Sequence, residues 1–260
     1  MTPRKLLIKL GGTLLDAPDS RLRLAREIAA AAAQRDIRIV VVHGGGKQMT
    51  RFLAERGVES RFVNGLRVTT PEVIDAVLKV FAGSVNSELV AAFRAAGARP
   101  VGLSGLDAGL VDAELLNPDL GAVGKPVRSD AHLLDLLTTE SYLPIVACVA
   151  GDDLGNVYNV NADQMAVACA VSFQAESLVF LTDVEGVRDK EGAICSTLTC
   201  DQSRQLIQDG VATGGMQAKL EAAMDALGKG VHQVRIAPGA LTGLVHLLLS
   251  DQPVGTLLVP

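Results

Sequence analysis

Residues 5–15, KLLIKLGGTLL, contain the stretch that decides the fold. A short apolar strand at residues 6–8 is followed by one lysine, Lys9, and then by two glycines, Gly11 and Gly12. Glycine lets the backbone turn sharply and lets a ligand approach its N–H groups closely. The lysine adds a positive charge at the same turn. Taken alone, this stretch indicates an anion site and an ordinary strand-to-helix turn about equally.

The same pattern of strand, glycine turn and helix returns one unit later. Residues 37–42, IRIVVV, form an apolar, β-branched run that predicts a parallel strand buried on both faces. It ends in His43 and the three glycines at 44–46, and residues 47–56 then predict a helix that ends at Gly57. His43 is a candidate base, but a histidine at the end of a strand is more often structural, and we favour the structural interpretation.

Length and composition place the chain among globular α/β proteins. Of its 260 residues, 48% are hydrophobic, 20% are charged and 3% are aromatic, and the net charge is −5. Because the chain has no long basic run, we expect no nucleic-acid partner. We find no signal peptide and expect no apolar segment to approach the ~20 residues of a membrane span. Four cysteines without a C-x-x-C pair fit a reducing compartment, so we predict a cytoplasmic protein.

Predicted strands and helices alternate along the rest of the chain. Further buried strands are expected at residues 99–103, 143–149, 177–182, 233–237 and 255–259, and longer helices at 21–35, 71–95 and 217–227. Residues 109–127 predict short hairpins, and 61–70 predict a polar loop. We therefore predict a three-layer αβα sandwich around a mostly parallel open sheet. No linker interrupts it.

The candidate ligand contacts follow the ends of the predicted strands, where open α/β sheets bind their ligands. Backbone N–H groups that could contact phosphate belong to Gly11, Gly12, Gly44, Gly45 and Gly46. The common nucleotide fingerprints are absent, because no complete P-loop and no G-x-G-x-x-G after a strand is present. A metal-ligand cluster is also missing from the sequence.

Two further clusters exceed what local structure requires. Residues 156–163 lead into a predicted helix that runs through residue 170, and they hold three asparagines and Asp163, more polar groups than one helix cap needs. Lys219 lies in the first turn of a predicted helix, where the helix dipole disfavours a cation unless an anion is nearby. Asp163 could still be a simple helix cap.

Seven motifs in register resemble the amino-acid kinase superfamily and, within it, the acetylglutamate kinases. They are IKLGG at 8–12, VHGGG at 42–46, FVNGLRVT at 62–69, VGLSG at 101–105, NVNAD at 159–163, LTDVEGV at 181–187 and GGMQAK at 214–219. Aspartokinases and isopentenyl phosphate kinases begin with a similar glycine turn, so the NGLRVT loop is the specific part. The resemblance covers nearly the whole chain.

This resemblance implies an ATP-dependent phosphorylation of the side-chain carboxylate of N-acetyl-L-glutamate, in arginine biosynthesis. Lys9 and Lys219 would approach the transferred phosphoryl group from two sides, and Asp163 would orient both lysines. Arg67 and Asn159 would bind the acyl amino acid, Arg67 through a carboxylate. The acceptor is already a carboxylate, so positioning and charge neutralisation can suffice without a general base.

The same resemblance implies the contacts of the phosphates and of the nucleotide. Gly11, Gly12, Gly44 and Gly45 would hold the phosphates and the transferred group, and the nucleotide would lie against Thr182, Asp183, Gly186, Gly214, Gly215 and Met216. Mg²⁺ would arrive with ATP, held mainly by phosphate and water, so we expect no dedicated protein ligands. Residues 1–175 would then form a lobe for the acyl amino acid and dimerisation, and residues 176–260 a nucleotide-binding lobe.

Two departures from the resemblance affect these expectations. Many relatives have proline before the second lysine, whereas this chain has Ala218. The arginine-inhibited relatives form hexamers through an N-terminal helix, for which the few residues before the first strand leave no room. We therefore expect a homodimer, formed through the helix at 71–95.

Three other functions stay open at this point. A related kinase could act on aminoadipate or glutamate attached to an acidic carrier protein, but residues 109–120 contain Asp112, Glu114 and Asp119 and no basic residue, so they would repel such a partner. Another N-acyl amino acid could be the substrate. A non-catalytic relative is disfavoured, because both lysines and Asp163 are present.

Overall fold

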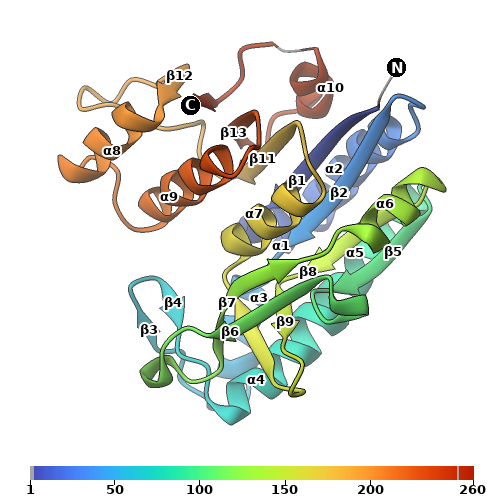
Figure 1. Cartoon of the computed structure of the whole chain (residues 1–260), viewed down its shortest axis with the longest axis vertical. Helices are drawn as coiled ribbons and strands as arrows, with labels where there is room; N and C mark the ends of the chain where they lie inside the picture. Colours follow the sequence, from blue (N-terminus) through green and yellow to red (C-terminus); the bar gives the residue numbers. More distant parts are fainter. Residues whose placement is uncertain (1–2, 251) are drawn as a thin grey trace.

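A large sheet forms the centre of the computed structural model, which describes residues 3–250 and 252–260 (Figure 1). Its strands, in spatial order, are β12 (Thr197–Thr199), β14 (Thr256–Val259), β13 (Gln233–Pro238), β11 (Ser177–Thr182), β1 (Arg4–Leu10), β2 (Ile37–His43), β8 (Leu143–Ala147) and β5 (Pro100–Ser104). Only β13 and β14 pair antiparallel among these neighbours. The predicted mostly parallel open sheet is confirmed.

The register of the central strands brings their ends to one edge of the sheet. Leu10, near the end of β1, pairs with His43 of β2 and with Leu181 of β11. All three strands are buried along nearly their whole length, as expected of apolar runs covered on both faces. The glycine turns after β1 and β2 therefore leave the sheet side by side.

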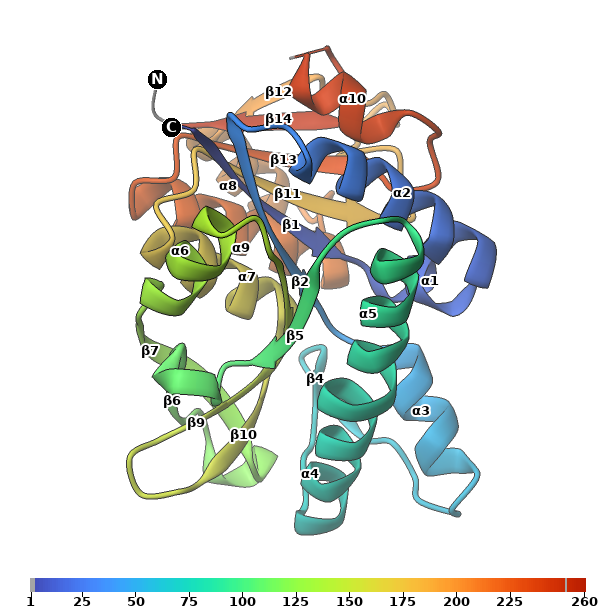
Figure 2. The same cartoon turned by 90° about the vertical axis from the view of Figure 1, so that its right-hand side faces the viewer.

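Helices cover both faces of the sheet, as the two views show (Figures 1 and 2). One layer contains α1 (Gly12–Asp16), α2 (Pro18–Ala32), α3 (Gly46–Ala54), α5 (Asn86–Ala95) and α10 (Leu244–Leu249), and the other contains α6 (His132–Thr139), α7 (Ala162–Ser172) and α9 (Gly214–Gly228). On α2, Leu24 and Ile28 are fully buried at the predicted i, i+4 spacing. The predicted three-layer arrangement is confirmed.

Short strands extend beyond the carboxyl edge of the large sheet. Four of them pair in a closed arrangement: β6 (Val111–Leu115), β7 (Val123–Ser129), β9 (Val149–Gly151) and β10 (Val157–Val160). A small hairpin, β3 (Phe62–Val63) with β4 (Leu66–Arg67), stands where a loop was predicted. Residues 143–149, predicted as one strand, divide between β8 and β9.

The longest helix runs without interruption over residues Pro71–Ala95. It consists of α4 (Pro71–Val77), the π-helical segment η1 (Leu78–Val85) and α5. By length and composition alone it could cross a membrane, with 25 residues and a hydropathy of 1.4, so the expectation that no segment approaches that length was wrong. Its apolar character has another cause, since 44% of the window is buried and α5 packs on β5 and β8.

Three further elements, α1, β12 and α8 (Cys200–Gln208), correspond to no helix or strand predicted from the sequence. The start of α8 carries a visible signal, because Thr199 and Gln202 form a capping box with reciprocal side-chain to backbone hydrogen bonds. That spacing in the sequence could have revealed the helix.

Candidate active site

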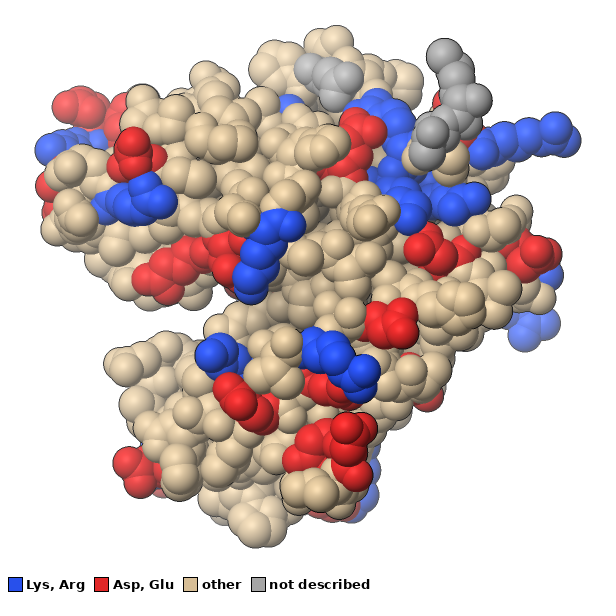
Figure 3. All heavy atoms as spheres, viewed as in Figure 1, with Lys and Arg blue, Asp and Glu red and all other residues tan. Residues whose placement is uncertain are grey.

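A cavity of about 700 Å³ opens at the carboxyl edge of the sheet. It lies between the start of α9 and the β3–β4 hairpin, where the space-filling view shows a deep notch (Figure 3). Nine of the predicted site residues line it: Lys9, Gly11, Gly44, Gly45, Gly46, Arg67, Thr182, Asp183 and Lys219. These residues come from separate segments of the chain, so the sheet is what brings them together.

Two lysines meet one carboxylate at the inner end of this cavity. Lys9 Nζ lies 2.7 Å from Asp163 Oδ1, and Lys219 Nζ lies 3.3 Å from Oδ2. The side chains are 9%, 8% and 17% exposed for Lys9, Asp163 and Lys219. Lys9 forms a close ion pair with Oδ1, and Lys219 donates a hydrogen bond to Oδ2.

The electrostatics of this triad keep Asp163 ionised. Burial would raise the pKa of the Asp163 carboxyl, but the charges and hydrogen bonds of Lys9 and Lys219 outweigh burial, so its pKa lies below the ordinary value. One carboxylate shared by two ammonium groups leaves an excess positive charge beside the cavity. Such a site is suited to an anion whose negative charge grows during a reaction.

Asp163 is free to make these contacts because another residue caps its helix. Asn161 is the N-cap of α7, and its Oδ1 accepts hydrogen bonds from the backbone N–H groups of Asp163 and Gln164, at 2.8 and 3.2 Å. The interpretation of Asp163 as the cap is therefore wrong. An acidic residue in the first turn of a helix is also favoured by the helix dipole.

The glycine turns differ in the N–H groups that they leave available. Gly11 N donates to Leu181 O at 2.9 Å, so this N–H is already used. A Cβ at Gly11 would lie 2.7 Å from the same oxygen, which leaves no room for a side chain. Gly12 begins α1, and its surroundings lie outside the described residues.

The second glycine turn offers unused donors at a helix start. Within the described residues, the N–H groups of Gly44, Gly45 and Gly46 have no protein acceptor. Gly46 is the first residue of α3, so these donors point from a helix N-terminus, a favourable place for an anion. A Cβ at Gly45 would lie 2.8 Å from the ring of Phe81 on η1, so the helix packs directly against the turn.

His43 supports this turn from below. Its ring is fully buried, Nε2 accepts from Asn86 Nδ2 at 3.0 Å, and Nδ1 donates to Gly44 O at 2.8 Å. Burial lowers the pKa of His43 to about 4, although the bond to Gly44 opposes the shift, so the ring is neutral near pH 7. This geometry agrees with the structural interpretation of His43.

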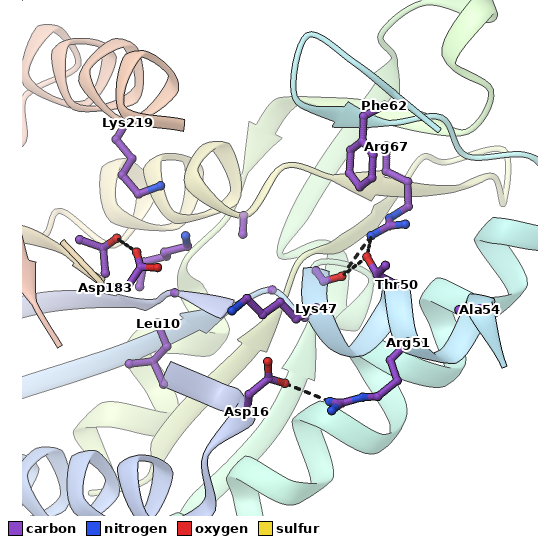
Figure 4. A pocket seen from close by; sticks show the side chains of 17 residues that line it. Leu10, Asp16, Lys47, Thr50, Arg51, Ala54, Phe62, Arg67, Asp183 and Lys219 are labelled. Atoms are coloured by element: carbon purple, nitrogen blue, oxygen red, sulfur yellow. Dashed lines mark hydrogen bonds and ion pairs between the residues drawn. The ribbon is translucent and has the colours of Figure 1, made fainter. Parts of the chain in front are cut away.

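Arg67 lies at the opposite end of the cavity and is 7% exposed. Its guanidinium donates to Ser60 Oγ, to Gly46 O at 3.1 Å and to Thr50 Oγ1 at 2.8 Å, and it stacks on the ring of Phe62 at 4.6 Å. Burial lowers the pKa of Arg67. Among the residues that the structure describes, it has no carboxylate partner, so its charge is available to a ligand (Figure 4).

Several other predicted residues do not line the cavity. Asn159 is not among its lining residues, and its Nδ2 donates to Thr69 Oγ1 at 3.0 Å. Two of the predicted nucleotide contacts, Thr182 and Asp183, do line the cavity, and Thr182 Oγ1 donates to Asp183 Oδ1 at 3.1 Å. The remaining predicted nucleotide contacts, Gly186, Gly214, Gly215 and Met216, are not among the lining residues. Gly186 packs instead against Thr256, whose Oγ1 would lie 2.8 Å from a Cβ there.

Comparison with known proteins identifies the family of this chain. The family model described as "Amino acid kinase family" matches residues 4–238. The chain belongs to this family. An acetylglutamate kinase of Solibacter usitatus is 62% identical over 255 residues, which cover 98% of this chain and 99% of that protein. An acetylglutamate kinase of Bartonella tribocorum is 42% identical, over 98% of this chain and 89% of that protein.

Solved structures show the same amino acid kinase fold. The smu.665 protein of Streptococcus mutans superimposes with a TM-score of 0.82 at 28% identity and covers 98% of both chains. An N-acetylglutamate synthase from Neisseria gonorrhoeae, complexed with coenzyme A and N-acetyl-glutamate, gives a TM-score of 0.88 at 27% identity. It matches all of this chain over 60% of its own length. The predicted resemblance to acetylglutamate kinases is confirmed.

Several side chains that line the cavity of this family member were not predicted from the sequence. Asp16 and Arg51 form an ion pair of 3.0 Å that links α1 to α3, and Lys47 and Thr50 line the same wall (Figure 4). Their place in the sequence held a signal, since each follows a glycine turn within one helical turn or two. The position of these residues in the sequence predicts that they lie near a glycine turn, but it does not predict whether their side chains point into the cavity.

Proposed function

We propose that this chain transfers the γ-phosphoryl group of ATP to the side-chain carboxylate of N-acetyl-L-glutamate, forming an acyl phosphate in arginine biosynthesis. The observation that carries the proposal is the pair of lysines held by Asp163 beside a cavity whose other end presents Arg67. Acetylglutamate kinases that are 62% and 42% identical over nearly the whole chain support the same assignment.

In this proposal the lysines act on the transferred group. Lys9 and Lys219 are oriented by a shared carboxylate, so their ammonium groups flank one position at the inner end of the cavity. In-line transfer spreads negative charge over the phosphoryl oxygens, and fixed cations stabilise that charge without reorganising. The attacking carboxylate needs no deprotonation, so no base is required and buried His43 stays outside the reaction.

Arg67 and the second glycine turn hold the acceptor. The guanidinium is fixed by neutral acceptors and by the ring of Phe62, which leaves its charge to pair with a carboxylate of the acyl amino acid. The free N–H groups of Gly44 and Gly45 lie between the two ends and can bind the reacting oxygens. Asn159 acts one step further back, by holding Thr69.

The nucleotide would lie against Thr182 and Asp183, with the phosphates directed toward Lys219. Gly11 and Gly12 shape the turn below, and Gly186, Gly214, Gly215 and Met216 would act through the backbone around the nucleotide rather than by lining the cavity. Mg²⁺ fits as an ion carried by ATP phosphates and water, because the carboxylates that line the cavity, Asp16 and Asp183, are few and separate.

We propose the same division of labour between the two lobes that the sequence predicts. Residues 1–175 supply the acceptor end and residues 176–260 the nucleotide end, with Lys9 and Asp163 at the junction. We also propose a cytoplasmic homodimer formed through helix Pro71–Ala95, on which the apolar side chain of Leu78 is 37% exposed. Light scattering of the purified protein should give twice the mass of the chain, and a stable monomer or hexamer would contradict the dimer.

The test of this function is ADP release from Mg-ATP with a panel of acceptors. N-acetyl-L-glutamate, free glutamate, aspartate and N-acetylaminoadipate should be compared, with hydroxylamine present in parallel to trap an acyl phosphate. We expect turnover and hydroxamate only with N-acetyl-L-glutamate. Turnover with none of them, despite ATP binding, would contradict the assignment and favour a carrier-bound substrate or a silent relative.

A further inference from the structure

A third lysine, Lys47, lines the cavity and has no part in the function described above. It is an exposed residue in the first turn of α3, directly after the second glycine turn. Figure 4 shows its side chain running along the cavity wall toward the side where Leu10 and Asp183 lie, away from Arg67 and Thr50. Its ammonium group is therefore directed at the phosphate end of the cavity.

The other cations that line the cavity are all engaged. Lys9 and Lys219 share Asp163, and Arg51 pairs with Asp16 at 3.0 Å. Arg67 is held by neutral acceptors. For Lys47, by contrast, the structure shows neither an ion pair nor a hydrogen bond of its side chain anywhere in residues 3–250 and 252–260.

The position of Lys47 has a cost that a phosphate would remove. The first turn of α3 contains no acidic residue, so the helix dipole disfavours a cation there. The same turn presents the unused N–H groups of Gly44, Gly45 and Gly46. A doubly charged group with several acceptor oxygens would satisfy the N–H donors and the ammonium group together.

From this geometry we infer that Lys47 binds the terminal phosphoryl group of ATP from the α3 side, opposite the lysines held by Asp163. The inference rests on the proposed kinase function and deepens it. Three cations would then surround the transferred group, two held by the Asp163 carboxylate and one supplied by α3. ADP lacks that group, so Lys47 distinguishes ATP from ADP and contributes little to the acyl amino acid.

The experiment compares ATP and ADP binding by calorimetry for the wild type, Lys47→Met, Lys47→Arg and the control Lys229→Met. Lys229 is a surface lysine at the end of α9, outside the cavity. Lys47→Met should weaken ATP binding about tenfold or more, as expected for a lost bond between charged groups, and should change ADP binding much less. Lys47→Arg should recover most of the loss, and Lys229→Met should behave as the wild type.

Steady-state kinetics on the same variants completes the test. In Lys47→Met, KM for ATP should rise or kcat should fall, with KM for N-acetyl-L-glutamate unchanged. Equal weakening of ATP and ADP, a change confined to the acceptor KM, or no change in any constant would overturn the inference. An inactive wild type would instead contradict the proposed function. The comparison of ATP and ADP binding by calorimetry would still decide the role of Lys47.

Discussion

The two ends of the cavity hold their cations in different ways. At the inner end, Lys9 and Lys219 are fixed by a buried carboxylate, whereas Arg67 at the outer end is fixed by hydroxyl groups, a carbonyl oxygen and an aromatic ring. The Asp163 carboxylate fixes the positions of the two ammonium groups and neutralises part of their positive charge. The neutral groups around Arg67 fix the position of the guanidinium and leave its full positive charge available to a ligand. We expect the inner end to govern kcat and the outer end to govern acceptor binding.

The largest effect is expected at Asp163. The change Asp163→Asn keeps the shape but leaves two ammonium groups without a counter-charge, so both lysines lose their orientation. We expect kcat to fall about 10²–10³-fold, the size seen when one preorganised electrostatic contact is removed, with KM for the acceptor changed much less. Steady-state kinetics measures both constants.

A control on the same helix separates orientation from stability. Asn161→Ala removes the cap of α7, at a cost of about 1 kcal/mol in unfolding free energy, without touching the lysines. If Asn161→Ala lowered kcat as much as Asp163→Asn, the special role of the carboxylate would be disproved.

His43 differs from the cations at both ends of the cavity, because it is a buried neutral ring that hydrogen bonds hold in place. Its pKa is lowered to about 4 in the folded chain by burial, below the ordinary value of 6.5. As the pH falls, His43 therefore takes up a proton in the unfolded chain before it does so in the folded chain. Its contribution to the free energy of unfolding is fully present above pH 6.5 and is lost as the pH falls toward 4. We expect about 3 kcal/mol of unfolding free energy to be lost across this window.

Denaturant unfolding at several pH values tests this expectation. His43→Gln should unfold with a weaker pH dependence between pH 6.5 and 4, and His232→Gln, a change of an exposed histidine, should keep the slope of the wild type. Asp163 does not affect the measurement between pH 6.5 and 4. Because its pKa is lowered in the folded chain, its contribution to the free energy of unfolding is lost only at more acid pH. Equal slopes in both variants would refute the assignment to His43.

At the outer end, Arg67→Lys keeps a positive charge and removes the planar group that several acceptors and Phe62 hold in place. We expect KM for N-acetyl-L-glutamate to rise about 30-fold, corresponding to about 2 kcal/mol for a charged hydrogen bond, with kcat within a few-fold of the wild type. A fall in kcat with an unchanged KM for N-acetyl-L-glutamate would contradict the expectation that the outer end of the cavity governs acceptor binding.

The smallest effect is expected at Asn159, which supports Thr69 and does not line the cavity. Asn159→Ala should raise KM for the acceptor only about threefold, in line with about 0.5–1 kcal/mol for one neutral hydrogen bond. A loss as large as that of Arg67→Lys would show that Asn159 contacts the acyl amino acid directly.

Much of the fold could be predicted because strong local patterns agreed with the tertiary structure. The runs ending at Leu10 and His43 became central buried strands, and Thr182 ended β11 as expected. Residues 157–160 were interpreted as leading into a helix, but they form β10, because pairing with β7 and β9 outweighed a weak local preference.

Site residues could be predicted where a charged residue occupies a position in a helix or strand that disfavours its charge. Lys219 at a helix start and Lys9 at a strand end both needed a nearby anion, and the structure shows Asp163 there. Lys47 is unusual in the same way and was missed, because only the fold shows that its side chain is directed into the cavity. The sequence also gave no sign that Gly11 uses its own N–H within the protein.

The most direct test of the account is the single-turnover rate of acyl phosphate formation by the wild type and by Lys9→Ala, with ATP and N-acetyl-L-glutamate both saturating. We predict that the rate falls about 10²–10³-fold in Lys9→Ala, because charge on the transferred group loses a fixed cation, while ATP still binds. A rate equal to that of the wild type would contradict the claim that the lysine pair held by Asp163 carries the chemistry.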